Sequence, residues 1–162
     1  MINTNARLDE HAYFVQATAI AALTSTAGDA AYVSMKGYER CCIVVDVTNG
    51  STVTGGAVTL KQATAVAGTN EKALSFSRMK ANTDVGAGQA LTETAVSNDT
   101  FTTGTTNSKR LRYVIDVKAS DLDVANGFDC LRVDVDSMAN ATGQVSYILY
   151  GAKYAGSSPM AD

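Results

Sequence analysis

The chain reads Tyr113-Val114-Ile115-Asp116-Val117 at one point, and the same pattern recurs at Leu131-Arg132-Val133-Asp134-Val135 and at Ile43-Val44-Val45-Asp46-Val47. In each segment the first, third and fifth residues are apolar. Successive side chains of a β-strand point to opposite faces of its sheet, so the apolar residues of each segment share one face. We therefore predict three core strands. Their opposite faces carry Asp46, Asp116 and Asp134, which indicates contact with water near the strand ends.

The rest of the chain predicts further short strands, with no long helix between them. We expect strands over 31–35, 39–48, 57–63, 72–80, 91–96, 100–103 and 144–153. Residues 12–23 fit both a strand and a helical face, and we favour a strand. Short strands separated by Gly, Asn, Asp and Ser are typical of a sandwich or barrel rather than of an α/β fold. The predicted fold class is therefore all-β, a two-sheet, jelly-roll-like β-sandwich.

Two connections carry specific turn signals. Asn49-Gly50 follows the first core strand, and this pair tolerates the positive φ of a tight turn, so we expect the chain to reverse there. Between the other two core strands, Ser120 can cap one short helical turn near residues 120–125. Asn126-Gly127 can then end that turn in the left-handed conformation.

Length and charge limit the kind of protein. The 162 residues suffice for one domain, which we place at 11–155, with an N-terminal arm at 1–10 and a flexible C-terminal tail at 156–162. A net charge of −3 argues against a non-specific nucleic-acid binder, because that mode of binding relies on clustered Lys and Arg. The apolar part of 12–23 is too short to span a bilayer, and residues 1–7 lack the layout of a signal peptide. We expect neither nucleic acid nor membrane as a partner, and synthesis in a reducing cytoplasm.

Cys41, Cys42 and Cys130 form an odd set of cysteines. Adjacent cysteines rarely bridge each other, because a disulfide requires a specific geometry, so we expect three reduced thiols. Cys42 and Cys130 open two of the core strands and are expected to be buried there as small apolar residues. The chain has no Cys-x-x-Cys pair and His11 is its single histidine, so no zinc site is predicted.

The best candidate for a metal loop is the segment 121–127, which is rich in side-chain oxygens. It departs from the helix-loop-helix calcium pattern. That pattern requires an oxygen ligand where Ala125 stands, Gly where Asn126 stands and a bidentate Glu where Arg132 stands. We therefore favour a capped turn over a metal site.

The three strand aspartates are a second candidate site. Asp46, Asp116 and Asp134 could converge as catalytic carboxylates do in glycosidases. Like charges that face each other across a sheet are destabilising, so we favour ion pairs with nearby cations, namely Arg112, Arg132 or Lys118.

The remaining candidates are a histidine and a group of tyrosines. His11 lies beside Glu10, and nothing in the sequence places it near a nucleophile. Tyr147, Tyr150 and Tyr154 could form a stacking platform for a sugar or a base, but we favour positions in the core and rim of the sandwich. We assign no catalytic, cofactor-binding or metal-binding residue, and we expect that the protein is not an enzyme and needs no cofactor.

Several longer stretches resemble small virion proteins of tailed bacteriophages. The stretches are 71–76 (EKALSF), 83–85 (TDV), 113–117 (YVIDV) with 119–123 (ASDLD), and 127–135 (GFDCLRVDV), and the resemblance runs from about residue 8 to residue 154. It implies a capsid decoration (cement) protein, a β-sandwich or jelly roll on the outer surface of a phage head. It also implies the major capsid protein as partner, self-association as a homo-oligomer with a trimer favoured, and synthesis in the cytoplasm of a bacterial host before assembly on the virion. No functional residues transfer, because such families act through surfaces.

Three other functions stay open at this point. A carbohydrate-binding β-sandwich module would need exposed, coplanar tyrosines. A small β-fold hydrolase would need His11 or the three aspartates to meet in a pocket. Another phage structural protein, from the tail or the head–tail junction, would share the fold.

Titration of the denatured protein without reductant should detect all three thiols, because no disulfide is predicted. A chelator should leave the melting temperature unchanged, because no structural metal is predicted. A missing pair of thiols, or a large drop in melting temperature with chelator, would contradict this account.

Overall fold

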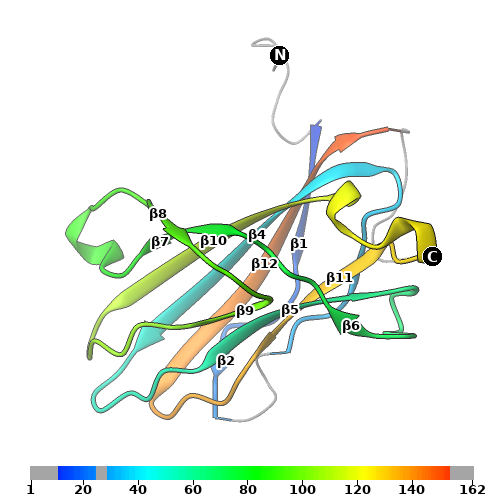
Figure 1. Ribbon diagram of the computed structural model, residues 1–162. Helices are drawn as coiled ribbons and strands as arrows, with labels where there is room; N and C mark the ends of the chain where they lie inside the picture. Colours follow the sequence, from blue (N-terminus) through cyan, green and yellow to red (C-terminus); the bar gives the residue numbers. More distant parts are fainter. Residues whose placement is uncertain (1–10, 25–28, 154–162) are drawn as a thin grey trace.

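Two antiparallel sheets pack face to face in the computed structural model, which describes residues 11–24 and 29–153 (Figure 1). The seven-stranded sheet has the order β1 (Ala12–Gln16), β12 (Ala141–Ala152), β4 (Tyr38–Asn49), β10 (Arg110–Lys118), β7 (Arg78–Asn82) and β8 (Thr92–Ala95), and β2 (Ala21–Ala22) also pairs with β12. The five-stranded sheet has the order β3 (Val33–Ser34), β11 (Cys130–Val135), β5 (Ala57–Ala63) and β6 (Lys72–Ala73), and β9 (Thr100–Thr102) also pairs with β5. The predicted all-β sandwich is confirmed, and so is the preference for strand over helix in residues 12–23.

The chain alternates between the sheets along its second half. It passes from β8 to β9, β10, β11 and β12, and changes sheet at every step. Repeated crossing of this kind is a feature of jelly rolls. The sheets are unequal, with seven and five strands, so the similarity to a regular jelly roll is confined to the crossings.

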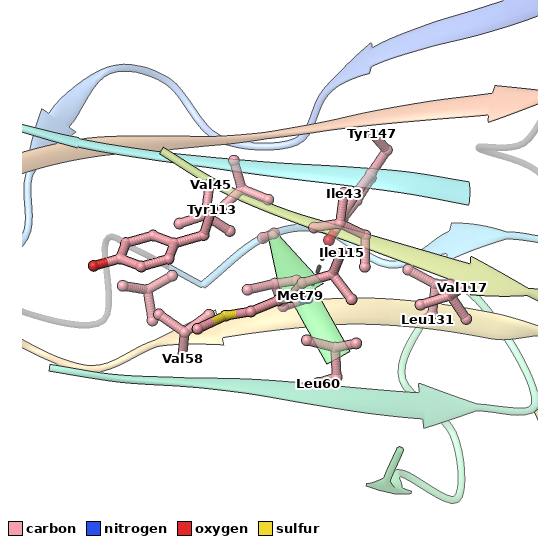
Figure 2. Close-up of a cluster of buried hydrophobic side chains, with 14 of the residues drawn as sticks. Ile43, Val45, Val58, Leu60, Met79, Tyr113, Ile115, Val117, Leu131 and Tyr147 are labelled. Atoms are coloured by element: carbon pink, nitrogen blue, oxygen red, sulfur yellow. Dashed lines mark hydrogen bonds between the residues drawn. The ribbon is translucent and has the colours of Figure 1, made fainter. Parts of the chain in front are cut away.

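The three repeated segments form the centre of the core. They lie on β4, β10 and β11, and their first, third and fifth residues are all buried, as predicted. Figure 2 shows the side chains of Ile43, Tyr113 and Ile115 from one sheet between the two layers, together with those of Val58, Leu60 and Leu131 from the other sheet. The period-two pattern therefore identifies the inner face of both sheets.

Tyr147 on β12 links the two sheets through its hydroxyl group. Its ring is buried in the core, and the hydroxyl accepts a hydrogen bond from the Val133 amide at 3.1 Å and donates one to the Ala31 carbonyl at 3.2 Å. Burial raises the pKa of this hydroxyl well above its usual value. The polar tip of a buried tyrosine needs such partners. Here one is Val133 on β11 of the facing sheet, and the other is Ala31 in the chain that leads into β3.

The strand predicted over 72–80 is wrong. This segment divides between β6 in one sheet and β7 in the other, and residues 74–77 cross between them. The alternation changes phase at the crossing, because the buried residues on its two sides, Leu74 and Met79, are five positions apart. A period-two pattern holds within one strand and does not reveal that the chain changes sheet.

The tight turn predicted at Asn49-Gly50 is also wrong. Asn49 ends β4, and the chain then passes through a loop to β5 in the other sheet. The positive φ falls on Thr52, at 56°. The Asn49 side chain is 2% exposed, and its amide group donates to the carbonyls of Gly104 at 2.9 Å and Thr106 at 3.0 Å. The asparagine therefore holds a distant loop instead of forming a hairpin.

The helical turn predicted near 120–125 is present as two 3-10 turns, η3 (Ala119–Asp121) and η4 (Val124–Asn126). A separate 3-10 turn, η2 (Val85–Ala87), follows β7. Ser120 does not cap η3 or η4, because the Asp121 carboxylate accepts from the Lys118 amide at 2.9 Å instead. Gly127 adopts the predicted left-handed conformation, with φ of 82°.

The predicted arm, residues 1–10, and the predicted tail, residues 156–162, lie outside the described residues.

Replacing Tyr147 by Phe should lower the free energy of unfolding by about 1–3 kcal/mol, because the buried Val133 amide loses its hydrogen-bond acceptor. Urea unfolding of the variant and the wild-type protein measures the difference. Tyr13→Phe is the matched control, since the Tyr13 side chain is 44% exposed and should tolerate the loss of its hydroxyl. Equal stability of the two variants would contradict the role of the Tyr147 hydroxyl.

Candidate interaction surface

The outer face of the five-stranded sheet is covered by its own side chains and by the loop that follows β5. Tyr32, Ala63 and Cys130 are buried there and pack with Val66 in a small cluster. Beside them, the guanidinium of Arg132 lies 5.1 Å from the centre of the Tyr32 ring. Within the described ranges, no strand of this sheet carries an exposed large apolar side chain.

A network of charges extends across the same face. Lys61 Nζ lies 2.7 Å from Glu71 Oε1 and 2.5 Å from Asp134 Oδ2, and Arg132 Nη2 lies 3.1 Å from Glu71 Oε2. The Lys61 ammonium and the Tyr32 hydroxyl, which donates to Glu71 at 2.5 Å, hold the pKa of Glu71 below its usual value. Arg132 Nε lies 2.8 Å from Asp134 Oδ1 without hydrogen-bond geometry. The charges compensate one another within the protein.

The outer face of the seven-stranded sheet is different. The strand register places Phe14, Ile148 and Cys42 in one row across β1, β12 and β4, and Val44 and Val114 in the next row. Phe14 is 54% exposed and the other four are half-buried. In the described part of the chain, no strand or 3-10 turn is paired or packed over these residues. We call these five residues the open face.

Ion pairs lie at both ends of the open face. At one end Arg112 donates to Asp46 through Nε at 2.7 Å and Nη2 at 3.0 Å. At the other end Arg40 Nε donates to Asp116 Oδ2 at 3.1 Å, and the Tyr150 hydroxyl donates to Asp116 Oδ1 at 2.9 Å. An apolar centre with a polar rim is the usual composition of a protein–protein interface.

The three strand aspartates do not form a common site. Asp134 lies on the five-stranded sheet, while Asp46 and Asp116 lie on separate strands of the other sheet and each binds an arginine. The preference for ion pairs over a carboxylate site is confirmed, because Asp46 pairs with Arg112 and Asp134 with Arg132, two of the three cations named from the sequence. Asp116 pairs with Arg40, which was not among those cations.

An open cleft of about 1050 Å³ adjoins the open face. It lies where β7 separates from β10, because β7 pairs only with Arg112, Tyr113 and Val114. Among the described strands, β4 is the only sheet neighbour of the following residues, 115–118. The cleft is lined by residues of β10, β4 and β12, by β7 with the chain that enters it, by β8 with the residues that follow it, and by Asp121 of η3.

The cysteines differ in their exposure. Cys41 and Cys130 are buried, whereas Cys42 is half-buried and lines both the open face and the cleft. Burial of Cys130 was predicted correctly, but burial of Cys42 was not, because alternation along β4 turns Cys41 inward and Cys42 outward. Burial raises the pKa of both Cys41 and Cys42.

The other candidate residues are separate from this surface or already bound. His11 is exposed. In the loop 121–127, the Asp123 carboxylate binds Lys72 and accepts from Asn126 at 2.8 and 2.9 Å. Within residues 11–24 and 29–153, no three His, Cys, Asp or Glu side chains are placed to hold a metal ion. The same residues contain no helix with the length and apolar character to cross a membrane.

The tyrosine platform considered for a sugar or a base is not formed by Tyr147, which is in the core as we favoured. Tyr150 is half-buried against Arg40 and Asp116, and Tyr154 lies outside the described residues. The open face is not among the sites predicted from the sequence. One feature of the sequence could have indicated this face. Val44 in β4 and Val114 in β10 are apolar although they stand at outward positions, where an alternating strand usually carries polar residues.

The fold of the chain is similar to that of one protein of known structure. No family model and no curated protein matches the chain. The crystal structure of the SPBc2 prophage-derived protein YomS is similar over 85% of this chain and 91% of that chain, with 13% sequence identity and a TM-score of 0.44. We base no functional conclusion on a match of this degree.

Labelling of the native protein with a small thiol reagent should modify Cys42 and leave Cys41 and Cys130 unmodified, because only Cys42 reaches the surface. The raised pKa of Cys42 should make the reaction slow near neutral pH and faster as the pH rises, since the thiolate is the reactive form. Mass spectrometry of the digested protein identifies the modified residue. Labelling that persists in Cys42→Ser at the same rate would contradict this assignment.

Proposed function

We propose that the chain is a non-enzymatic virion structural protein, a capsid decoration (cement) protein that binds the outer surface of a phage head and stabilises it. The resemblance of residues 113–117, 119–123 and 127–135 to small virion proteins motivates the proposal. These residues form β10, the η3 turn, and β11 with the glycine and loop residues before it. Their inward side chains, such as Ile115, Leu131 and Val133, build the core of the sandwich.

The observation that carries the proposal is the open face. A sheet face with partly exposed apolar side chains between two arginine–aspartate pairs is suited to bind another protein. The opposite face of the sandwich is occupied by its own charge network and small apolar cluster. The molecule therefore presents one side to a partner and the other to water.

The partners we propose are the major capsid protein and further copies of the chain, with a trimer favoured. Closed cyclic symmetry is the common form of homo-oligomers, and a trimer can match a local three-fold axis of a shell lattice. Repetition of the contact over several linked subunits increases the overall affinity, so each single contact can be weak. Neither nucleic acid nor membrane is a proposed partner.

Purified protein should co-sediment with phage capsids that have been stripped of it, and light scattering should give the mass of a trimer. Phe14→Asp should weaken capsid binding at least about tenfold, because it places a charge at the most exposed residue of the open face. Val124→Asp is the matched control, since Val124 is 58% exposed on the η4 turn, away from the open face, and should bind as the wild-type protein does.

A monomer that does not bind capsids but is retained on polysaccharide would replace this proposal with the carbohydrate-binding module. Equal loss of binding in both variants would show that the open face is not the contact. Circular dichroism of each variant confirms that its fold is retained before binding is compared.

A further inference from the structure

The edge of β10 is a place where another strand can pair. Residues 110–118 pair with β4 along one edge, but β7 covers only residues 112–114 on the other edge. The chain entering β7 leaves this edge to pair with the segment after β8, since the Phe76 amide donates to the Asn98 carbonyl at 3.1 Å and the Val96 amide to the Ser77 carbonyl at 3.0 Å. An edge of this kind presents backbone donors and acceptors to an added strand.

The cleft beside this edge has the mixed lining that an added strand requires. Alternate side chains of a strand point to opposite sides, and the cleft offers apolar groups from Leu74, Phe76 and Val96 as well as polar groups from β10 and β7. Its volume of about 1050 Å³ is open to solvent, so an extended segment can enter without unfolding the sandwich.

The charges of the cleft favour an acidic occupant. Four basic side chains line it, Arg40, Arg78, Lys80 and Lys118, against three acidic ones, Glu93, Asp116 and Asp121. The carboxylates are in use, because Asp116 binds Arg40, Glu93 lies 3.9 Å from Arg78, and Asp121 accepts from a backbone amide. The ammonium groups of Lys80 and Lys118 form no ion pair with any residue in the described ranges. Their positive charge is available to a ligand.

We propose that the cleft receives an extended, acidic segment of a partner protein, which pairs with β10 at residues 115–117 and adds a strand to the seven-stranded sheet. The backbone pairing holds the segment in place, and its acidic side chains reach Lys80 and Lys118. That the partner is the capsid subunit rests on the proposed function. That the cleft recognises an acidic strand is inferred from the cleft alone and holds for any partner.

Two pairs of substitutions test the charge recognition on stripped capsids. The double variant K80Q/K118Q should bind at least about tenfold more weakly than the wild-type protein. The control K36Q/K153Q removes the same charge from two exposed lysines outside the cleft and should bind as the wild-type protein does. Equal binding of both double variants, or equal loss in both, would overturn the inference while leaving capsid binding by the wild-type protein established.

A second assay is independent of capsids and uses Cys42, which lines the cleft. The blocked heptapeptide TVEVDVT at millimolar concentration should slow thiol labelling of Cys42 at least about twofold in the wild-type protein and have no effect in K80Q/K118Q. The basic counterpart TVKVKVT should not slow it. If the wild-type protein ignores capsids but TVEVDVT protects Cys42, the proposed function fails and the acidic-strand site stands. Absence of protection by TVEVDVT, or equal protection by both peptides, overturns the site.

Discussion

Pairing of β4 along both of its edges is the constraint on which the rest of the structure depends. β12 pairs with it from Tyr38 to Asn49, and β10 pairs with it from Arg40 to Thr48. This long central pairing fixes the register of three strands at once, and a shift by one residue would turn Cys41, Ile43, Val45 and Val47 out of the core. The inner faces of β5 and β11 then pack against the surface that these strands provide.

The same register determines what each outer face presents. On the seven-stranded sheet, the outward positions bring arginines opposite or diagonal to aspartates at the ends and leave apolar residues in the middle. On the five-stranded sheet, the outward positions collect Lys61, Arg132 and Asp134 close to Glu71. Exposed ion pairs contribute little to stability, so their main effect is to limit which surfaces can approach each face.

Periodicity in the sequence predicted the core well and the connections poorly. The inner residues of β4, β10, β11 and β12 followed from alternation alone, and β5 was placed at 57–63 as observed. Alternation does not identify the sheet, so the segment 72–80 could not be divided from its pattern. A turn signal such as Asn49-Gly50 describes what the backbone permits, whereas the buried contacts of the asparagine side chain depended on a loop more than fifty residues away. Val44 and Val114 were local signals for the open face, but its assembly and the position of the cleft depend on pairing between distant strands, which no local pattern contains.

The placement of Asn49 also affects how the protein ages chemically. Asparagine followed by glycine is the dipeptide most prone to deamidation, because the glycine nitrogen can attack the asparagine side-chain carbonyl with little steric hindrance. Here the side-chain amide is held by two backbone carbonyls, and the Gly50 nitrogen donates to the Asn140 carbonyl at 2.7 Å. Both reacting groups are fixed away from the geometry of cyclisation. The fold thereby slows deamidation at a position where the dipeptide would otherwise favour it.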